Sequence, residues 1–436
     1  MTSAGKAAFT LSTALLLSYL ILTIPLEVLA QQEMTPKWVI ENGEHFVKLA
    51  ISADGKYIAA ATNNTNLLYM FCGNELQWAS PVDRVHSLMM SANGKYVAVG
   101  TKDHFYLFDR RNPALQVKYP LDCQNSLAAI STDGAVTAVG TTLPTPNNAQ
   151  ESKLYLIEEE KSAPTWNRTL QGTLQSLSIS DDGNYIVAST TQPGVLYLFT
   201  REATLPLWTY TFGEQCGGAK ISNNGNYIVA VGGNQTAEKD LRIYRFLRQI
   251  PIPNYMKAIS EVPSSSGISI SANGSIFAMS YPRNNRLVVF TLELPPYGYG
   301  PGSISNVSLP SRSVSMSMSS DGRHIIVGTS DGIFVYEHPL RQLNLVRQFT
   351  VGNPHVIDIA SSTNGQLIVA AIAIDQNDES SAIYLFDLAK EPPPIVPELW
   401  LHIGLLLATS LGASATIAYH FHKKRGARSR SQKAVS

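Results

Sequence analysis

Three histidines are placed where a metal site could form. His45, His86 and His355 each lie at the start of an apolar segment that opens a repeated unit of the sequence. Imidazole nitrogens bind zinc, copper and related ions, so three converging rings would supply most of a coordination shell. The three histidines lie at different distances along the sequence from the repeated motif. The alternative is that they cap or pack strands. We therefore name these three as metal candidates and expect no cofactor.

Other groups of reactive residues are sparse. Asp375, Asp378 and Glu379 form an acidic cluster that could attract a cation, with a solvated loop as the simpler interpretation. The run 158–160 is all glutamate and is expected to be a solvated strand edge. The sequence contains no Gly-x-Ser-x-Gly elbow, His-Glu-x-x-His run or phosphate-binding loop. No catalytic set is predicted, and the chain is not expected to be an enzyme.

The elements that would position these residues follow from an eightfold internal repeat. Residues 51–60 read Ile-Ser-Ala-Asp-Gly-Lys-Tyr-Ile-Ala-Ala, and similar decapeptides recur along the chain. The Asp-Gly or Asn-Gly pair suits a tight hairpin turn, because these residues tolerate positive φ angles. An apolar strand precedes each turn, and two further strands and a more polar fourth follow it. Four strands per 39 to 49 residues is the period of a propeller blade. The turn glycines are Gly55, Gly94, Gly134, Gly183, Gly225, Gly274, Gly322 and Gly365.

The eighth repeat lacks its own fourth strand, because Glu391 is followed by three prolines that stop it. A suitable strand, Lys-Trp-Val-Ile-Glu at 37–41, lies before the first repeat. Such a strand would complete the last blade and leave the ring without open edges. We predict an all-β, eight-bladed β-propeller over residues 37–390, closed by this N-terminal strand. Seven blades with a degenerate hairpin is the alternative.

The repeat resembles a known family. The Ser-x-Asp-Gly turn, the period and the aromatic third strand, as in Tyr106-Leu-Phe-Asp109, are similar to WD-repeat and quinoprotein-like β-propellers. The likeness is strongest to the surface-anchored type found in archaea, and it covers about residues 37–390. The Gly-His pair and the Trp-Asp dipeptide of true WD repeats are missing. The resemblance therefore implies the fold and leaves the function open.

Both ends of the chain carry apolar segments. Residues 1–30 have the pattern of a signal peptide cleaved after Ala30, with an uncleaved N-terminal anchor as the alternative. Residues 399–421 contain no Asp, Glu, Lys or Arg and are long enough to form one transmembrane helix. A proline-rich linker at 391–398 precedes this span, and a basic tail at 422–436 follows it. The positive-inside rule places that tail in the cytoplasm and the propeller outside the cell.

The charge of the body argues against nucleic-acid binding. Residues 31–422 contain 26 basic and 32 acidic residues, whereas a nucleic-acid surface needs an excess of positive charge. Cys123 and Cys216 could pair outside the cell only if the fold brings them together, and we leave that open. The sequence has five Asn-x-Ser/Thr sites, including one at Asn273. The glycosylation candidates among them are Asn63, Asn167, Asn234 and Asn306.

These features predict a single-pass cell-membrane protein whose extracellular propeller is a binding or scaffolding module. The chain leaves the last blade after its third strand, on the face that carries the turns, and the linker is short. That face should point at the membrane, and the opposite face should present the variable loops 143–153, 233–240 and 375–381 to a protein or glycan partner. The alternatives are a propeller enzyme, such as a quinoprotein-like dehydrogenase or a glycan hydrolase, and an accessory subunit of a membrane complex.

Overall fold

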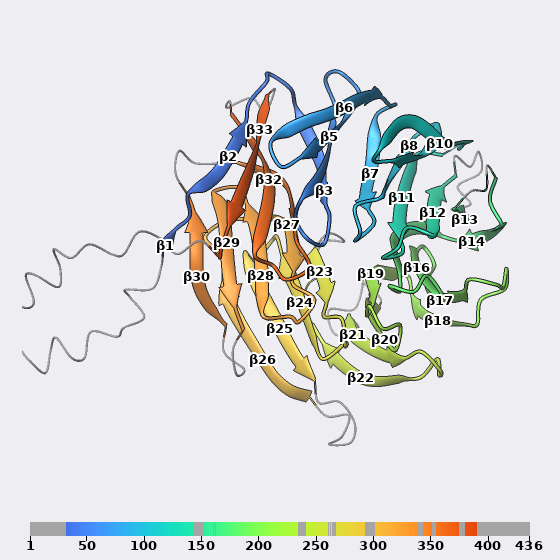
Figure 1. The fold of residues 1–436 in the computed structure, drawn as a ribbon. Coiled ribbons are helices and arrows are strands. Elements are labelled where there is room, and N and C mark those ends of the chain that lie inside the picture. The colour runs from blue at the N-terminus through green and yellow to red at the C-terminus, as the bar shows by residue number, and fades with distance from the viewer. Residues whose placement is uncertain are drawn as a thin grey trace, which may run out of the picture. The chain divides into compact units, whose positions relative to one another are not determined.

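The computed structural model describes residues 32–389 with short gaps, and its described part is all β. The gaps fall at 122, 144–150, 160, 162, 234–240, 260, 262, 264–266, 293–300, 339–342, 351–354 and 375–379. Within the described ranges the chain forms 33 strands in eight sheets. The sheets follow one another around a ring (Figure 1), and each packs against the next. The prediction of eight blades is thereby confirmed over the alternative of seven.

Blades 1 to 4 each use four consecutive strands in simple up-and-down order. Blade 1 contains β3 (Phe46–Ile51), β4 (Tyr57–Thr62), β5 (Leu67–Cys72) and β6 (Glu75–Pro81). Blade 2 contains β7 (Val85–Met90), β8 (Tyr96–Thr101), β9 (His104–Asp109) and β10 (Asn112–Pro120). Blade 3 contains β11 (Asn125–Ile130), β12 (Val136–Thr142), β13 (Glu151–Glu158) and β14 (Trp166–Gln171). Blade 4 contains β15 (Thr173–Ile179), β16 (Tyr185–Thr191), β17 (Gly194–Thr200) and β18 (Trp208–Gly213).

Blades 5 to 7 repeat this order, and blade 8 takes its fourth strand from the N-terminus. Blade 5 contains β19 (Gln215–Ile221), β20 (Tyr227–Gly233), β21 (Arg242–Leu247) and β22 (Pro253–Ala258). Blade 6 contains β23 (Ile268–Ile270), β24 (Ile276–Tyr281), β25 (Arg286–Leu292) and β26 (Pro301–Ser308). Blade 7 contains β27 (Ser313–Met318), β28 (His324–Thr329), β29 (Gly332–Glu337) and β30 (Asn344–Phe349). Blade 8 contains β31 (Val356–Ser361), β32 (Leu367–Ala373), β33 (Ser381–Asp387) and β2 (Pro36–Ile40).

The N-terminal strand closes the ring as the sequence predicts. Strand β2 runs antiparallel to β33, with Val39 opposite Tyr384 and Ile40 opposite Ile383. In Figure 1 the blue strand β2 accordingly lies beside the red strand β33. The ammonium group of Lys37 adds an ion pair with Asp387 at 3.3 Å. The first and last parts of the propeller are therefore joined in one sheet.

A second N-terminal strand was not predicted. Strand β1 (Gln32–Glu33) pairs in parallel with β30, the outer strand of blade 7. The carboxylate of Glu33 accepts hydrogen bonds from Gln348 Nε2 at 3.0 Å and Thr350 Oγ1 at 2.7 Å. Met34 then turns inward and is buried against the side chains between blades 7 and 8. The N-terminal segment thus holds two neighbouring blades rather than one.

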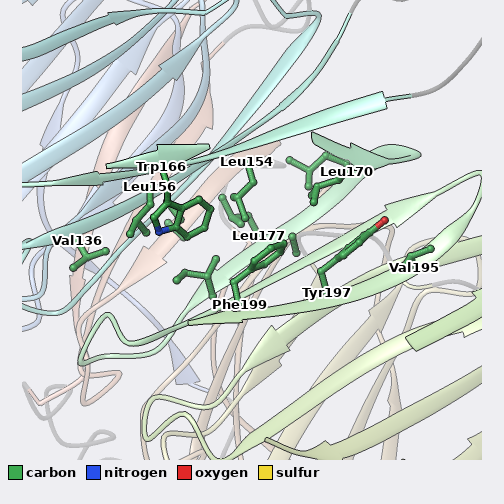
Figure 2. Packing of buried hydrophobic residues seen from close by; sticks show 14 residues of the cluster. Val136, Leu154, Leu156, Trp166, Leu170, Leu177, Val195, Tyr197 and Phe199 are labelled. Atoms are coloured by element: carbon green, nitrogen blue, oxygen red, sulfur yellow. The ribbon is translucent and has the colours of Figure 1, made fainter. Parts of the chain in front are cut away.

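The hydrophobic core is divided among the gaps between blades. Residues of β16 alternate between two of these gaps, so that Ile186 and Ala188 pack toward blade 3 while Val187 packs toward blade 5. Because side chains of a strand point to opposite faces of its sheet, a blade buried on both faces needs an apolar second strand throughout. Figure 2 shows the gap between blades 3 and 4, where Trp166 and Phe199 meet with ring centroids 5.8 Å apart.

Each repeated turn is organised by its serine as well as its glycine. Ser52 Oγ donates to Asp54 Oδ1 at 2.6 Å and accepts from the backbone N–H of Tyr57 at 3.0 Å. Gly55 follows with φ of +72°. The same hydrogen bonds recur in all eight turns, and every one of their serines is at most 2% exposed. The serine of the repeat is therefore a buried polar link between the first two strands. The eight serines are Ser52, Ser91, Ser131, Ser180, Ser222, Ser271, Ser319 and Ser362.

The turns also form a closed circle of backbone hydrogen bonds from blade to blade. Ala53 N–H donates to Ala92 O in the next blade at 2.8 Å, and the series ends where Thr363 N–H donates back to Ala53 O at 3.1 Å. The six intermediate bonds, each from a backbone N–H to a carbonyl oxygen of the next blade, are Asn93 to Thr132, Thr132 to Asp181, Asp181 to Asn223, Asn224 to Ala272, Ala272 to Ser320 and Ser320 to Thr363. We call the side of the ring that carries these eight turns the turn face, and the opposite side the loop face.

The chain divides into two compact units at residues 1–388 and 389–436. Of the second unit the structure describes only Ala389. No helix of the described residues is long and apolar enough to cross a membrane. The predicted signal peptide or anchor at 1–30, the linker at 391–398, the span at 399–421 and the tail at 422–436 lie outside the described residues.

Candidate functional site

A central channel runs between the inner strands of the eight blades. Its cavity measures about 640 Å³, and residues of β3, β7, β11, β15, β19, β23, β27 and β31 line it. The wall alternates aliphatic side chains with serine hydroxyls such as those of Ser178, Ser269 and Ser317. One pair of these hydroxyls meets across a gap between blades, where Ser317 Oγ lies 2.7 Å from Ser361 Oγ. The channel is therefore polar along much of its length.

Charged groups are few in the described channel wall. Lys220 of blade 5 lines it, and no described residue makes a hydrogen bond or ion pair with its ammonium group. Removal from bulk water lowers the pKa of Lys220. On blade 8, Asp358 accepts hydrogen bonds from Leu49 N–H and Ser315 Oγ, both at 3.0 Å. Burial raises the pKa of the Asp358 carboxyl, and the positive charge of Lys48 opposes that rise. The described wall therefore carries one lysine and one hydrogen-bonded carboxyl group on different blades.

The structure does not bring the three candidate histidines together. His86 lines the channel, and burial lowers the pKa of its imidazole. His45 and His355 precede β3 and β31 near the loop face, where their carbonyls accept hydrogen bonds from Asn63 and Ala373. Among the described residues no three His, Cys, Asp or Glu side chains are grouped so that they could hold a metal ion.

The cysteines and the glycosylation candidates are separated around the ring. Cys123 and Cys216 do not pair with each other, because they are buried in different gaps between blades. Cys72 is free and partly exposed. The side chains of Asn63, Asn167, Asn273 and Asn306 are exposed, whereas Asn234 lies outside the described residues. The four exposed asparagines are therefore accessible to a modifying enzyme.

The predicted recognition loops lie mostly outside the described residues. Residues 144–150, 234–240 and 375–379, with the acidic cluster of Asp375, Asp378 and Glu379, lie outside the described residues. On the loop face the described residues form two polar anchors. Tyr69 Oη donates to Glu44 at 2.8 Å, and Tyr106 Oη donates to Asp83 at 2.6 Å.

These anchors fix the connectors between blades. Glu44 lies in the connector that leads into blade 1, and Asp83 lies in the one that leads into blade 2. Burial and the hydrogen bond to Glu44 raise the pKa of Tyr69 to about 12. The hydrogen bond from Tyr106 is the main cause of the lowered pKa of Asp83. The loop face therefore has a rigid frame, which the sequence analysis missed because the partners are 23 to 25 residues apart.

On the turn face, tryptophans of the outer strands reach the next blade. Trp78 Nε1 donates to the carbonyl oxygen of Arg110 at 2.8 Å, and the Arg110 guanidinium lies 3.7 Å from the ring centroid of Tyr57. The same arrangement joins blades 4 and 5 through Trp208 and Arg248 at 2.7 Å. These contacts join neighbouring blades at the turn-face end of the hydrophobic gaps against which both tryptophans pack.

The glutamate run is not merely a solvated strand edge, which corrects the expectation from sequence. Glu158 bonds Arg201 of blade 4 at 2.8 Å and also Lys161. Glu159 bonds Lys95 of blade 2 at 2.7 Å. The hydrogen bonds from Lys161 and Arg201 lower the pKa of Glu158 to about 2. Two members of the run thus tie blade 3 to both of its neighbours, and Glu160 lies outside the described residues.

A Glu158→Gln variant should lose about 1 kcal/mol of unfolding free energy at pH 7, because half-exposed cationic partners limit what the ion pairs contribute. The folded-state pKa of Glu158 is depressed to about 2 from 4.5. Its contribution is therefore present above pH 4.5 and lost as the pH falls toward 2. Urea unfolding at pH 7 and at pH 3 measures this, and the exposed Glu202→Gln is the control. An equal loss in both variants, or the same loss at both pH values, would contradict the assignment.

Exposed aliphatic residues gather at one part of the turn face. The loop between β17 and β18 contains Leu205-Pro206-Leu207, and the loop between β21 and β22 contains Ile250-Pro251-Ile252. The four aliphatic side chains are 61%, 54%, 44% and 66% exposed in chain order. These are four of the ten large hydrophobic side chains exposed among the described residues. We call them the apolar tips.

Comparisons with known proteins identify the fold. No protein-family model matches the chain, and no curated protein matches it in sequence. Among solved structures, the β-propeller domain of Cps50 (Swd1) from Myceliophteria thermophila is similar with a TM-score of 0.52 at 9% identity. That match covers 81% of this chain and 99% of that domain. A chain in the structure of the Mitotic Checkpoint Complex is similar with a TM-score of 0.50 at 12% identity, covering 82% of this chain and 95% of that one.

Proposed function

We propose that this chain, which has a WD40-like β-propeller fold, is a binding or scaffolding module held at the outer surface of a cell membrane. A single C-terminal span would anchor it, and its loop face would meet a protein or glycan partner. A signal peptide would export the propeller, the basic tail would remain in the cytoplasm, and nucleic acid would not be a ligand. No cofactor takes part.

One observation carries the orientation. The backbone N–H of Leu388 donates to Gln366 O at 2.8 Å, and Gln366 lies directly after the turn glycine of blade 8. The chain therefore leaves the ring at the turn face. Ten residues, 389–398, separate Leu388 from the apolar segment 399–421. If that segment spans a bilayer, the turn face is the side near lipid, and the loop face is free for a partner.

The partner class follows from the scaffold. Loops on a rigid frame are where recognition residues are usually found, because the frame removes the cost of ordering them. The loop-face connectors are anchored by Glu44 and Asp83, as described above. One of the similar structures was solved within a multiprotein complex, the Mitotic Checkpoint Complex, which supports a protein partner for a propeller of this shape.

The test combines topology and capture. An epitope tag inserted at residue 147 and a second tag after Ser436 are expected to differ in intact cells. An antibody should reach the first tag directly and the second only after the membrane is permeabilised. Deleting 399–421 should move the protein from a carbonate-resistant membrane fraction to the soluble fraction. The reverse accessibility, or a full-length chain that carbonate releases, would refute the proposal.

The partner itself is sought by affinity purification of the intact chain from solubilised membranes. A co-purifying protein or glycan that is lost when the loops at 144–150 and 234–240 are replaced by short Gly-Ser linkers supports a loop-face binding module. Capture that survives loop replacement but not loss of the native span identifies an accessory subunit of a membrane complex instead. Turnover of a small substrate with nothing captured would identify an enzyme.

A further inference from the structure

The apolar tips are held out from the turn face by a rigid frame. The first residue of each loop is bonded to the repeated turn of its own blade. Arg201 N–H donates to Asn184 O at 2.9 Å, and Arg248 N–H donates to Asn226 O at 3.0 Å. Trp208 Nε1 then links the first loop to the second through Arg248 O. A proline in the centre of each tip fixes the local φ angle. The exposed side chains are therefore presented in fixed positions and lose little conformational freedom on binding.

Single exposed aliphatic residues need no explanation, but the two apolar tips lie on adjacent blades and do need one. Scattered exposed aliphatic side chains are normal, but neighbouring ones on a soluble surface mark a site of contact. Both tips repeat one pattern, an aliphatic residue on either side of proline, at equivalent places of two adjacent blades. No described residue covers them, since all four are at least 44% exposed.

The place of the tips relative to the exit of the chain indicates what covers them. Leu388 bonds Gln366 just as Arg201 bonds Asn184, so the chain leaves blade 8 at the position where the tip loop of blade 4 begins. In a ring of eight blades, blade 4 is opposite blade 8. The exit point and the tips therefore lie on the same face at opposite sides of the channel.

The length of chain before the apolar segment limits the distance to lipid. Ten residues separate Leu388 from position 399. Fully extended, they reach about 35 Å. A turn face tethered this closely presents its apolar tips to the same surface at high effective concentration. The guanidinium of Arg248, beside the second tip, lies 4.2 Å from the ring centroid of Tyr185 and supplies a positive charge that anionic headgroups attract.

We propose that the apolar tips insert into the outer leaflet of the membrane, so that the propeller rests on lipid at two opposite points of its turn face. This inference depends on the membrane anchoring proposed above. The ligand is the lipid surface itself, with the aliphatic side chains among the upper acyl chains and Arg248 at the level of the phosphates.

The test uses the full chain in vesicles of phosphatidylcholine and phosphatidylglycerol. With Cys72→Ser as background, an environment-sensitive NBD fluorophore is attached at Ile250→Cys or at Ile374→Cys. Both native residues are 44% exposed, but Ile374 follows β32 at the loop face and is the matched control. The remaining cysteines are buried and should not react. We expect a lipid-attached nitroxide to quench the probe at 250 at least about threefold more than the probe at 374, because interfacial insertion reaches about 5–10 Å into the leaflet.

The outcomes separate the inference from the anchoring. A chain that does not float with the vesicles refutes the anchoring and the inference together. A chain that floats while aqueous iodide quenches both probes equally leaves the anchoring intact and overturns the inserted tips. Shielding of position 250 from both quenchers also overturns them, because it shows that a protein surface, such as a second copy of this chain, covers the site.

Discussion

A chain that lacks residues 31–40 is expected to lose at least about 4 kcal/mol of unfolding free energy, which is a large share of the stability of an ordinary domain. The deletion removes β2 from β33 and leaves the edge of blade 8 open. It also removes Met34, which is 6% exposed, from the gap between blades 7 and 8. Urea unfolding of the protein in mild detergent, followed by tryptophan fluorescence, gives the difference.

Two controls make this prediction specific. Lys37→Ala removes only a half-exposed ion pair with Asp387 and should cost less than about 1 kcal/mol. A synthetic peptide of residues 31–41 added to the shortened chain should restore part of the lost stability, because it can occupy the vacant edge. An unchanged urea midpoint in the shortened chain would show that the ring does not depend on its N-terminal strand.

Gly274→Ala is expected to cost about 2–5 kcal/mol, although it adds a single methyl group in a turn. The glycine has φ of +74°, which costs an L residue about 1–2 kcal/mol. The new Cβ would also stand 2.5 Å from Tyr227 Cδ2 and 2.8 Å from Tyr227 Cβ, in the preceding blade. Relieving that overlap moves a packed ring and adds about 1–3 kcal/mol.

Gly43→Ala separates the two causes. Gly43 has a similar φ of +79°, but an added Cβ there would have no other atom within 4 Å. This variant should lose only about 1 kcal/mol, so the difference between the two variants measures the close approach of the blades. Urea unfolding under the same conditions compares them. Equal losses would show that the turns of neighbouring blades do not press on one another as the structure indicates.

The part of the fold that could be predicted from the sequence is the part encoded locally. The Asp-Gly and Asn-Gly pairs mark each hairpin, and their spacing gives the number of blades. The closing strand could be predicted because the eighth repeat has no fourth strand of its own. It was predicted at 37–41 and lies at Pro36–Ile40. Strand β1 was missed, since two residues carry no periodicity and their partner, β30, is about 315 residues away.

The contacts between blades could not be predicted, because they depend on the rotation from one blade to the next. The serine of the repeat was noted only as part of the Ser-x-Asp-Gly turn, with no structural role predicted for it, yet Ser52 is a buried link between strands. Glu158 was treated as solvated because its partner Arg201 lies 43 residues further on. The positions of the histidines could not be predicted either. All three lie near the starts of inner strands in the sequence, but His86 lines the channel whereas His45 and His355 are not among its lining residues.

The pairing of β2 with β33 also imposes a delay between the synthesis of β2 and its incorporation into a sheet. Lys37 and Asp387 are 350 residues apart, so β2 must wait for its partner until β33 has been synthesised. At about 5–20 residues per second, that wait lasts tens of seconds. During this time seven blades can fold in sequence while β2 remains without a sheet. Its short length and its alternation of half-buried and exposed residues suit a segment that must stay soluble until its partner emerges.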